Sequence, residues 1–166
     1  MIALHDFNHL PEKEALALLH PCVALPDWAK ALAHGRPYAS RDELFSTANA
    51  LTQNWDEAAL TQALSAHPRI GEKPAGSGTE AALSRQEQGA VNESDAALAQ
   101  ALREGNARYE ARFGRVFLIR AKGRSGEDIL QILNARLANS DAQEIRAALE
   151  QLREITLLRL EGVISE

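Results

Sequence analysis

Val116-Phe117-Leu118-Ile119-Arg120-Ala121 is the one stretch of this sequence whose residue types favour an extended backbone over a helix. Its first four residues are large and apolar, and β-branched and aromatic residues among them are typical of strands. A strand needs a partner to be stable, and the sequence predicts no second strand. We therefore expect 116–121 to be an extended connector, buried against the helices of an all-α protein.

Helical patterns fill the sequence on both sides of this connector. Asp6 or Asn8 would cap a first helix, with Pro11 in its opening turn and Pro21 at its end. Capping residues and apolar positions at helical spacing predict further helices over 26–34, 40–51, 56–67, 79–90, 94–113, 125–137 and 141–160. Since no repeat, linker or boundary is found, we expect a single compact domain, residues 1–166, of about seven or eight helices.

The composition agrees with a folded helical protein. Of the 166 residues, 45% are hydrophobic and 25% charged, as in ordinary globular proteins. Aromatic residues make up 5%, and frequent Ala and Leu favour helix over sheet. A net charge of -5 gives no support for a nucleic-acid partner.

Two further features concern the location of the protein. No apolar run approaches the roughly 20 residues of a membrane span, and the N-terminus lacks the pattern of a signal peptide. The single cysteine, Cys22, excludes an internal disulfide and is expected to be a small core residue. A cytoplasmic protein without membrane contact is therefore expected.

The most informative polar residue is His67, in the stretch Ala66-His67-Pro68-Arg69-Ile70-Gly71-Glu72-Lys73. Pro68 disfavours the helical conformation at the residue before it, so the preceding helix is expected to stop at about His67. The negative end of the helix dipole would then favour the protonated imidazole. Such a histidine could donate a proton in catalysis, although a cation at a helix end is more often a structural cap.

A second polar cluster is expected on the helix over 79–90. Ser84, Glu87 and Gln88 stand at i, i+3 and i+4, so they share one helix face. A hydroxyl, a carboxylate and an amide together suit a small polar molecule. The alternative is a solvated face, because polar triplets at this spacing are common.

Other candidates predict no site. His5 and His9 are four residues apart, as metal ligands can be, but no further Cys or His lies near them in sequence. A surface pair is therefore expected, and no metal site is predicted. The glycines of 71–78 lack the Gly-Lys-Ser/Thr ending of a phosphate-binding loop.

Taken together, these stretches resemble one family, the 2-oxo-4-hydroxy-4-carboxy-5-ureidoimidazoline (OHCU) decarboxylases of urate breakdown. The resemblance covers about residues 5–162 and depends on the order and spacing of several short motifs. They are His67-Pro68 with Gly71, Ser84-x-x-Glu87-Gln88, Asn106-x-x-Tyr109-x-x-x-Phe113-Gly114, Phe117-Leu118-Ile119-Arg120-Ala121, Gly123-Arg124-Ser125, Arg136-Leu137-x-Asn139, Glu144, and Ile155-x-x-x-Arg159-Leu160. Membership would imply an all-helical enzyme without a cofactor, often a homodimer, that acts on a small molecule.

The resemblance also implies roles for individual residues. His67 matches the family's catalytic histidine, and Glu87 would hold the substrate hydroxyl or help set the charge of His67. Arg159 matches an arginine expected near a substrate carbonyl or carboxylate. The other matching positions contact substrate, the last five through a backbone that would bind its ureido and ring amides: Pro68, Ser84, Gln88, Phe117, Leu118, Ile119, Arg120 and Ala121. Arg69 departs from the acidic residue of many members, and the loop 72–79 is this chain's own.

The implied reaction explains a site without metal or prosthetic group. The departing carboxylate of OHCU lies beside a ring C=N bond, which can accept the electron pair left by carbon dioxide. The protein need only orient the substrate and move protons. One proton added to the neighbouring carbon of the enol-like intermediate gives allantoin, and delivery from one side fixes the (S) hand. His67 is the expected donor, because an ordinary imidazole pKa of about 6.5 suits the task.

Two alternatives remain at this point. The chain could be a non-catalytic helical binding domain, with His67, Ser84 and Glu87 on its surface. It could also be a metal-assisted ureide hydrolase that uses His67 and a carboxylate.

Overall fold

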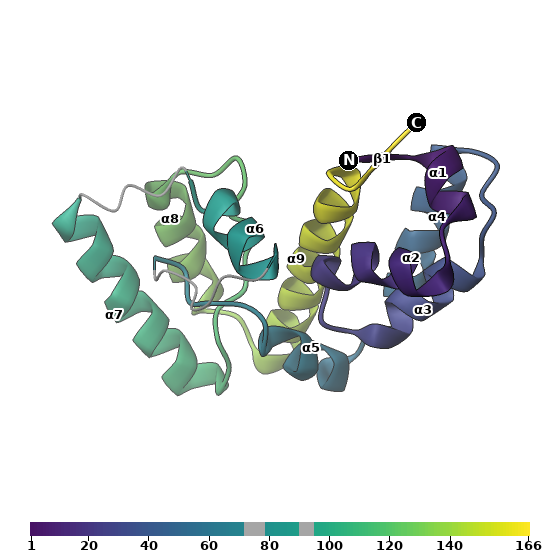
Figure 1. The fold of residues 1–166 in the computed structure, drawn as a ribbon. Helices are drawn as coiled ribbons and strands as arrows, with labels where there is room; N and C mark the ends of the chain where they lie inside the picture. The colour runs from purple at the N-terminus through teal and green to yellow at the C-terminus, as the bar shows by residue number, and fades with distance from the viewer. Residues whose placement is uncertain (72–78, 90–94) are drawn as a thin grey trace. The chain divides into compact units, whose positions relative to one another are not determined.

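The protein is almost entirely helical in the computed structural model, which describes residues 1–71, 79–89 and 95–166 (Figure 1). These residues form nine α-helices, one more than the upper expectation, with a short 3₁₀ helix and two strands of two residues each. The elements are β1 (Ile2–Ala3), α1 (Leu4–His9), α2 (Glu12–Leu19), η1 (His20–Cys22), α3 (Pro26–His34), α4 (Arg41–Thr52), α5 (Glu57–Leu64), α6 (Thr79–Glu87), α7 (Ala96–Phe113), α8 (Gly126–Arg136), α9 (Asp141–Glu161) and β2 (Ile164–Ser165). The all-α prediction is confirmed.

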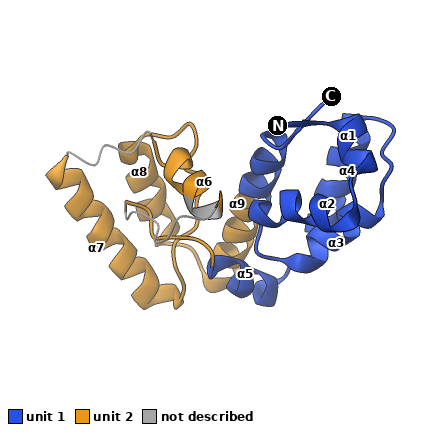
Figure 2. Ribbon diagram, viewed as in Figure 1, with its two compact units in different colours: residues 1–65, 153–166 blue, residues 66–152 orange. Residues whose placement is uncertain are grey.

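Contacts among the described residues divide the chain into two compact units (Figure 2). Unit 1 contains residues 1–65 and 153–166, and unit 2 contains residues 66–152. Helix α9 therefore contributes its first part to unit 2 and its last part to unit 1. That residues 1–166 act as one domain stays a prediction.

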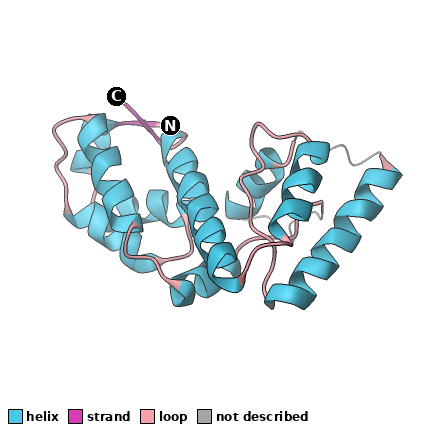
Figure 3. Cartoon of the chain, turned by 180° about the vertical axis from the view of Figure 1, so that it is seen from behind, coloured by secondary structure: helices cyan, strands magenta, loops and turns pink. Residues whose placement is uncertain are grey.

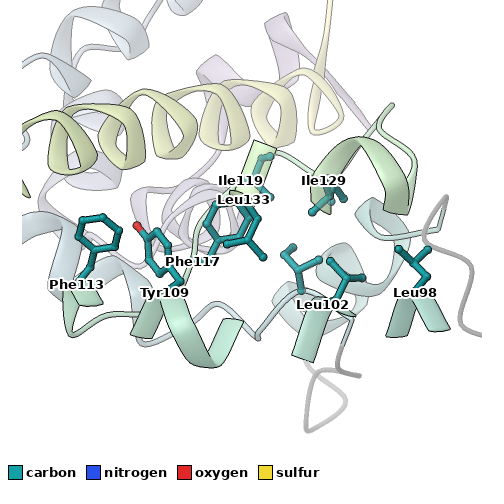
Figure 4. Close-up of a cluster of buried hydrophobic side chains, with 10 residues drawn as sticks. Leu98, Leu102, Tyr109, Phe113, Phe117, Ile119, Ile129 and Leu133 are labelled. Atoms are coloured by element: carbon teal, nitrogen blue, oxygen red, sulfur yellow. The ribbon is translucent and has the colours of Figure 1, made fainter. Parts of the chain in front are cut away.

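Unit 2 is organised around a cluster of buried side chains from α7, α8 and the segments beside them (Figure 4). Large apolar residues of the two helices face each other there at helical spacing. The buried members are Ile70, Leu98, Leu102, Tyr109, Phe113, Phe117, Ile119, Ala121, Ile129 and Leu133.

The stretch 116–121 is the expected buried connector between α7 and α8. It belongs to no helix or strand and is drawn as a loop in Figure 3. Phe117, Ile119 and Ala121 lie in the unit 2 cluster, whereas Leu118 is buried outside it. The members of the cluster are alternate residues of this stretch, as in an extended backbone, whose side chains point to opposite sides in turn. The prediction for this stretch is confirmed.

Several helix ends follow the expected capping chemistry. Asp95 caps α7 by accepting a hydrogen bond from the N–H of Leu98, and Gly114 ends this helix with a left-handed backbone, φ 71°. A non-glycine residue would be strained in that conformation. Ser125 and Asp128 form the capping box of α8. Predicted features at 72–78, Ala90 and Ser94 lie outside the described residues.

The prediction for the first helix is wrong. Residues 4–9 are themselves helical, so Asp6 and Asn8 lie inside α1, and Pro11 occupies the N-cap of α2. The side chain of Asn8 bonds the backbone of Tyr38 instead: Nδ2 donates to the carbonyl at 2.9 Å and Oδ1 accepts from the N–H at 2.9 Å. Tyr38, which is remote in sequence, therefore binds the polar atoms with which Asn8 would have capped a helix.

Helix α5 ends earlier than predicted. Its last residue is Leu64, and Ser65 closes it through bonds from its backbone N–H and its hydroxyl to the carbonyl of Gln62, at 3.3 and 2.7 Å. His67 is therefore not in the last turn. The effect of a helix dipole is confined to that turn, so the expected dipole effect on His67 loses its basis.

Unit 1 holds a second buried tyrosine. The hydroxyl of Tyr38 donates to the carbonyl of Leu32 at 2.6 Å, and the side chain is 4% exposed. Burial, and next the negative charge of Glu43, raise the pKa of Tyr38 to about 12. β1 and β2, which pair in parallel, belong to the same unit.

None of the helices in the described ranges combines the length and the apolar character that crossing a membrane requires.

Candidate active site

His67 lies in unit 2, in the irregular segment 66–71. The residue is half-buried, and its ring atom Nε2 is covered by protein. Pro68 is also half-buried. Nε2 of His67 is therefore shielded from bulk water, which strengthens its electrostatic interactions with any bound molecule.

Helix α7 and Gln88, the residue directly after α6, hold the segment 66–71. The N–H of Gly71 donates to Oε1 of Gln88 at 3.0 Å, and Nδ2 of Asn106 donates to the carbonyl of Ile70 at 3.0 Å. The guanidinium of Arg69 binds Glu110 through Nε at 3.0 Å and Nη2 at 2.9 Å. Hydrogen bonds or an ion pair therefore hold residues 69–71, which closely follow His67.

Helix α6 turns the predicted polar face inward. Ser84 is 3% exposed and Glu87 is half-buried, whereas Arg85 and Gln86 between them are exposed. Gln88 follows the last residue of the helix and is half-buried. Burial of Ser84 contradicts the alternative of a solvated face. Oε1 of Gln88 accepts from the N–H of Gly71, and substrate binding by Gln88 stays a prediction.

Hydrogen bonds hold the connector 116–121 at two points. Arg136 Nη1 donates to the carbonyl of Leu118 at 2.7 Å, and the N–H of Arg120 donates to Oε1 of Gln151 at 2.9 Å. The backbone N–H and C=O of Ile119 make no hydrogen bond to any described residue, although Ile119 is 3% exposed. Buried backbone groups usually have partners, so Ile119 offers a donor and an acceptor to a ligand.

Two side-chain atoms near these elements are also buried without a hydrogen bond to the described part of the chain. They are Oδ1 of Asn106, on the helix that holds Ile70, and Nε of Arg120, in the connector. A polar molecule or water would satisfy them. The family motifs include both residues, but nothing in the sequence pointed to these two side-chain atoms.

A buried ionic network contacts the connector through Arg136. Glu144 is fully buried and accepts hydrogen bonds from Tyr109, Arg136 and Asn139. Burial, and next the hydrogen bond to Glu144, raise the pKa of Tyr109 well above its usual value. The family motifs include these residues. No rule of sequence spacing could predict that they contact one another, because they come from three separate parts of unit 2.

Arg159 belongs to unit 1, where it is 3% exposed and donates from Nη1 to the carbonyl of Pro21 at 3.1 Å. Its role in binding substrate stays a prediction. In the described ranges, no group of three or more His, Cys, Asp or Glu side chains is arranged to hold a metal ion.

The sequence and the fold are similar to those of known proteins. A family model described as OHCU decarboxylase matches residues 8–161, which extend over both units. The 2-oxo-4-hydroxy-4-carboxy-5-ureidoimidazoline decarboxylase of Amia calva is 32% identical over 146 residues, 87% of this chain and 81% of that protein. A uric acid degradation bifunctional protein of Arabidopsis thaliana is 30% identical over 150 residues, 87% of this chain and 46% of that protein.

A solved structure is also similar. The crystal structure of an OHCU decarboxylase in the presence of (S)-allantoin superposes with a TM-score of 0.72 at 28% sequence identity. The match covers 86% of this chain and 94% of that chain.

Proposed function

Because the chain belongs to the OHCU decarboxylase family, we propose that it is a carboxy-lyase that converts OHCU to (S)-allantoin in urate breakdown, without a cofactor. The observation that carries the proposal is the hydrogen bond between Gly71 and Gln88. It ties the segment that bears His67 to the helix that bears Ser84 and Glu87. A proton donor and a set of polar binding groups are thereby held in one unit.

The reaction has two steps. The bond between the ring carbon and the carboxylate breaks, carbon dioxide leaves, and the electron pair moves toward the neighbouring C=N bond. The nitrogen of that bond takes a proton, which gives an enol. The enol takes a proton on the neighbouring carbon while its hydroxyl releases one, and the product is allantoin. A donor on one side of the ring gives a single hand of product.

His67 is the proposed general acid/base. Its Nε2 atom is covered by protein, and the bonds of Ile70 and Gly71 fix the segment on which it lies. Glu87, half-buried on α6, would hold the substrate hydroxyl or set the charge of the imidazole. Help of this kind is typically worth about 10²–10⁴ in rate.

The proposal also gives roles to the remaining binding groups. The hydroxyl of Ser84 and the Nε2 of Gln88 would contact polar groups of the ring, with Pro68 as an apolar wall. The connector backbone, through Ile119 above all, would bind the ureido arm. We also keep Arg159 in the proposal, as a ligand of a substrate carbonyl or carboxylate.

Assembly and location form part of the same proposal. We expect a cytoplasmic homodimer. The resemblance of the sequence to the family supports the dimer, and the single cysteine of the sequence, Cys22, which is buried, fits a reducing compartment. Light scattering coupled to size-exclusion chromatography would measure the mass in solution. A monomer at micromolar concentration would contradict the dimer without affecting the proposed chemistry.

The direct test follows freshly generated OHCU by absorbance and circular dichroism. The protein should accelerate its decay and yield (S)-allantoin alone. His67→Ala should lower kcat by about 10²-fold or more while the helical circular dichroism is kept. His34→Ala is the matched control, because His34 is an exposed histidine paired with Glu12 in unit 1.

Two outcomes would contradict the proposal. Decay of OHCU at the uncatalysed rate would point to a binding domain, and near-normal turnover by His67→Ala would remove this residue from the chemistry. A chelator in the assay separates the remaining alternative, because a metal-assisted hydrolase would lose activity and a decarboxylase of the proposed type would keep it.

A further inference from the structure

The connector 116–121 is held from one edge. In an extended backbone, the N–H and C=O of one residue point to one edge and those of the next residue point to the other. The two groups that the protein uses, the carbonyl of Leu118 and the N–H of Arg120, are two residues apart. They therefore share an edge, and the N–H and C=O of Ile119 point to the opposite one.

Arg136 is a rigid anchor for the first of these bonds. Its guanidinium is bound to the buried carboxylate of Glu144 through Nε and Nη2, which leaves Nη1 for the carbonyl of Leu118. The same guanidinium lies over the ring of Phe117, 4.5 Å from its centroid. One side chain therefore fixes both the backbone and a side chain at the start of the connector.

Gln151 supplies the second anchor. It lies on α9 within unit 2, is half-buried, and accepts from the N–H of Arg120 at 2.9 Å. Its side chain makes no other hydrogen bond to a described residue, so holding the connector is the one polar contact of this side chain within the described ranges.

We propose that Arg136 and Gln151 are positioning residues, which hold the connector by one edge so that the backbone N–H and C=O of Ile119 face the ureido arm of the substrate. The inference rests on the proposed function, because it names what sets the geometry of that binding group. Neither side chain would touch the substrate. A ureido group carries both N–H donors and a carbonyl acceptor, and it therefore fits the donor and the acceptor that one residue presents on one edge of an extended backbone.

Gln151 is the residue to change, because replacing Arg136 would leave the buried Glu144 without its cation and would threaten the fold. Gln151→Leu removes the acceptor, whereas Gln151→Glu keeps one at nearly the same place. Glu150→Ala, at an exposed position of the same helix, is the matched control. The readouts are kcat and KM for OHCU, the inhibition constants of (S)-allantoin and hydantoin, and the melting temperature.

Hydantoin is the allantoin ring without its ureido arm, so it separates positioning from a general loss of structure. Gln151→Leu should raise KM and the allantoin inhibition constant about five- to tenfold, the usual effect of one hydrogen bond. It should leave kcat within about threefold and hydantoin inhibition unchanged. Gln151→Glu should restore most of the affinity, and Glu150→Ala should behave like the unmodified protein.

The opposite results are equally clear. Unchanged KM in Gln151→Leu overturns the inference, as does an equal loss for hydantoin and allantoin that Gln151→Glu does not repair. Turnover of OHCU by the unmodified protein is measured first. Absence of turnover overturns the proposed function together with this inference. Normal turnover, with Gln151 variants that behave like the unmodified protein, overturns this inference alone.

Discussion

Glu87 and Gln86 are adjacent residues of α6 with opposite surroundings. Glu87 is half-buried on the face that contains Ser84, and Gln86 is exposed. Glu87→Gln keeps the shape and removes the negative charge, so it should lower kcat/KM for OHCU about tenfold or more if the carboxylate holds the substrate hydroxyl or the charge of His67. The mirror change Gln86→Glu places a carboxylate on the exposed face and should leave kcat/KM unchanged. Equal kcat/KM for Glu87→Gln and the unmodified protein would refute the role.

Arg69 gives this chain its own way of fixing the histidine segment. Its side chain is 46% exposed and that of Glu110 is 27% exposed, so the pair should contribute less than about 1 kcal/mol to folding. Its main effect should be on the position of the neighbouring residues. Arg69→Glu sets two carboxylates against each other and should lower kcat about three- to tenfold, with little change in melting temperature.

The charge swap supplies the control for that prediction. Arg69→Glu combined with Glu110→Arg restores an opposite-charge pair with reversed polarity. The double variant should recover most of kcat if the pair positions the segment. A double variant as slow as Arg69→Glu alone would show that Arg69 matters for a different reason.

At this scale the sequence predicted which polar residues gather, but it did not predict their partners. The spacing of Ser84 and Glu87 placed them on one face, and their burial agrees. Gln88 fits the same spacing, yet its Oε1 holds the backbone of Gly71. That bond joins residues 17 positions apart, and no local pattern contains it.

Among the helices, Glu144 is the connection on which unit 2 depends most. It is fully buried and joins the start of α9 to Tyr109 on α7 and Arg136 on α8. Glu144→Gln leaves the cation of Arg136 in the interior without a countercharge, which should cost about 3–5 kcal/mol of unfolding free energy. Urea unfolding followed by circular dichroism measures the loss. Glu150→Gln, exposed on the same helix, should change stability by less than about 0.5 kcal/mol.

A small effect of Glu144→Gln would contradict this assignment. It would mean that the network is loosely packed in solution and that Arg136 finds other partners. The proposed anchoring of Leu118 would then lose its support as well, because Arg136 owes its fixed position to Glu144.

The ends of helices were predictable where a local signal decides them. Ser125 with Asp128 and Asp95 with the N–H of Leu98 are bonds within one turn, so the sequence contains the whole interaction. Asn8 has an equally good capping side chain, but Tyr38 takes both of its polar atoms. Where a distant residue competes for the same group, short-range rules fail.

At the scale of the whole molecule, each unit encloses one of the two tyrosines of the chain. Tyr38 lies in unit 1 and Tyr109 in unit 2, and both are at most 4% exposed. Burial is the largest cause of a raised pKa in each case, to about 12 for Tyr38. In an unfolded chain the pKa of tyrosine is about 10. Above this pH an unfolded tyrosine is ionised, whereas the buried tyrosine of each folded unit stays protonated to a higher pH.

The direction of the pH dependence follows from linkage. Between pH 10 and about 12, the folded state retains a proton at Tyr38 that the unfolded state releases, so stability falls as the pH rises. The contribution of Tyr38 is fully present below about pH 10 and is lost as the pH passes about 12, with an upper limit of about 2–3 kcal/mol. The raised pKa of Tyr109 acts in the same direction.

Tyrosinate absorbance gives a direct measurement, because the chain has two tyrosines and no more. In the folded protein, ionisation should begin well above pH 10 and coincide with the loss of helical circular dichroism. Tyr38→Phe should lower stability at neutral pH by about 1 kcal/mol, through the lost bond to Leu32, and should also flatten the alkaline fall. Both proteins contain the same lysines, which ionise in the same pH range. The difference between their stabilities therefore excludes the contribution of the lysines. Ionisation of both tyrosines near pH 10 with the helices intact would mean that water reaches them in solution, and the tight packing of each unit would be contradicted.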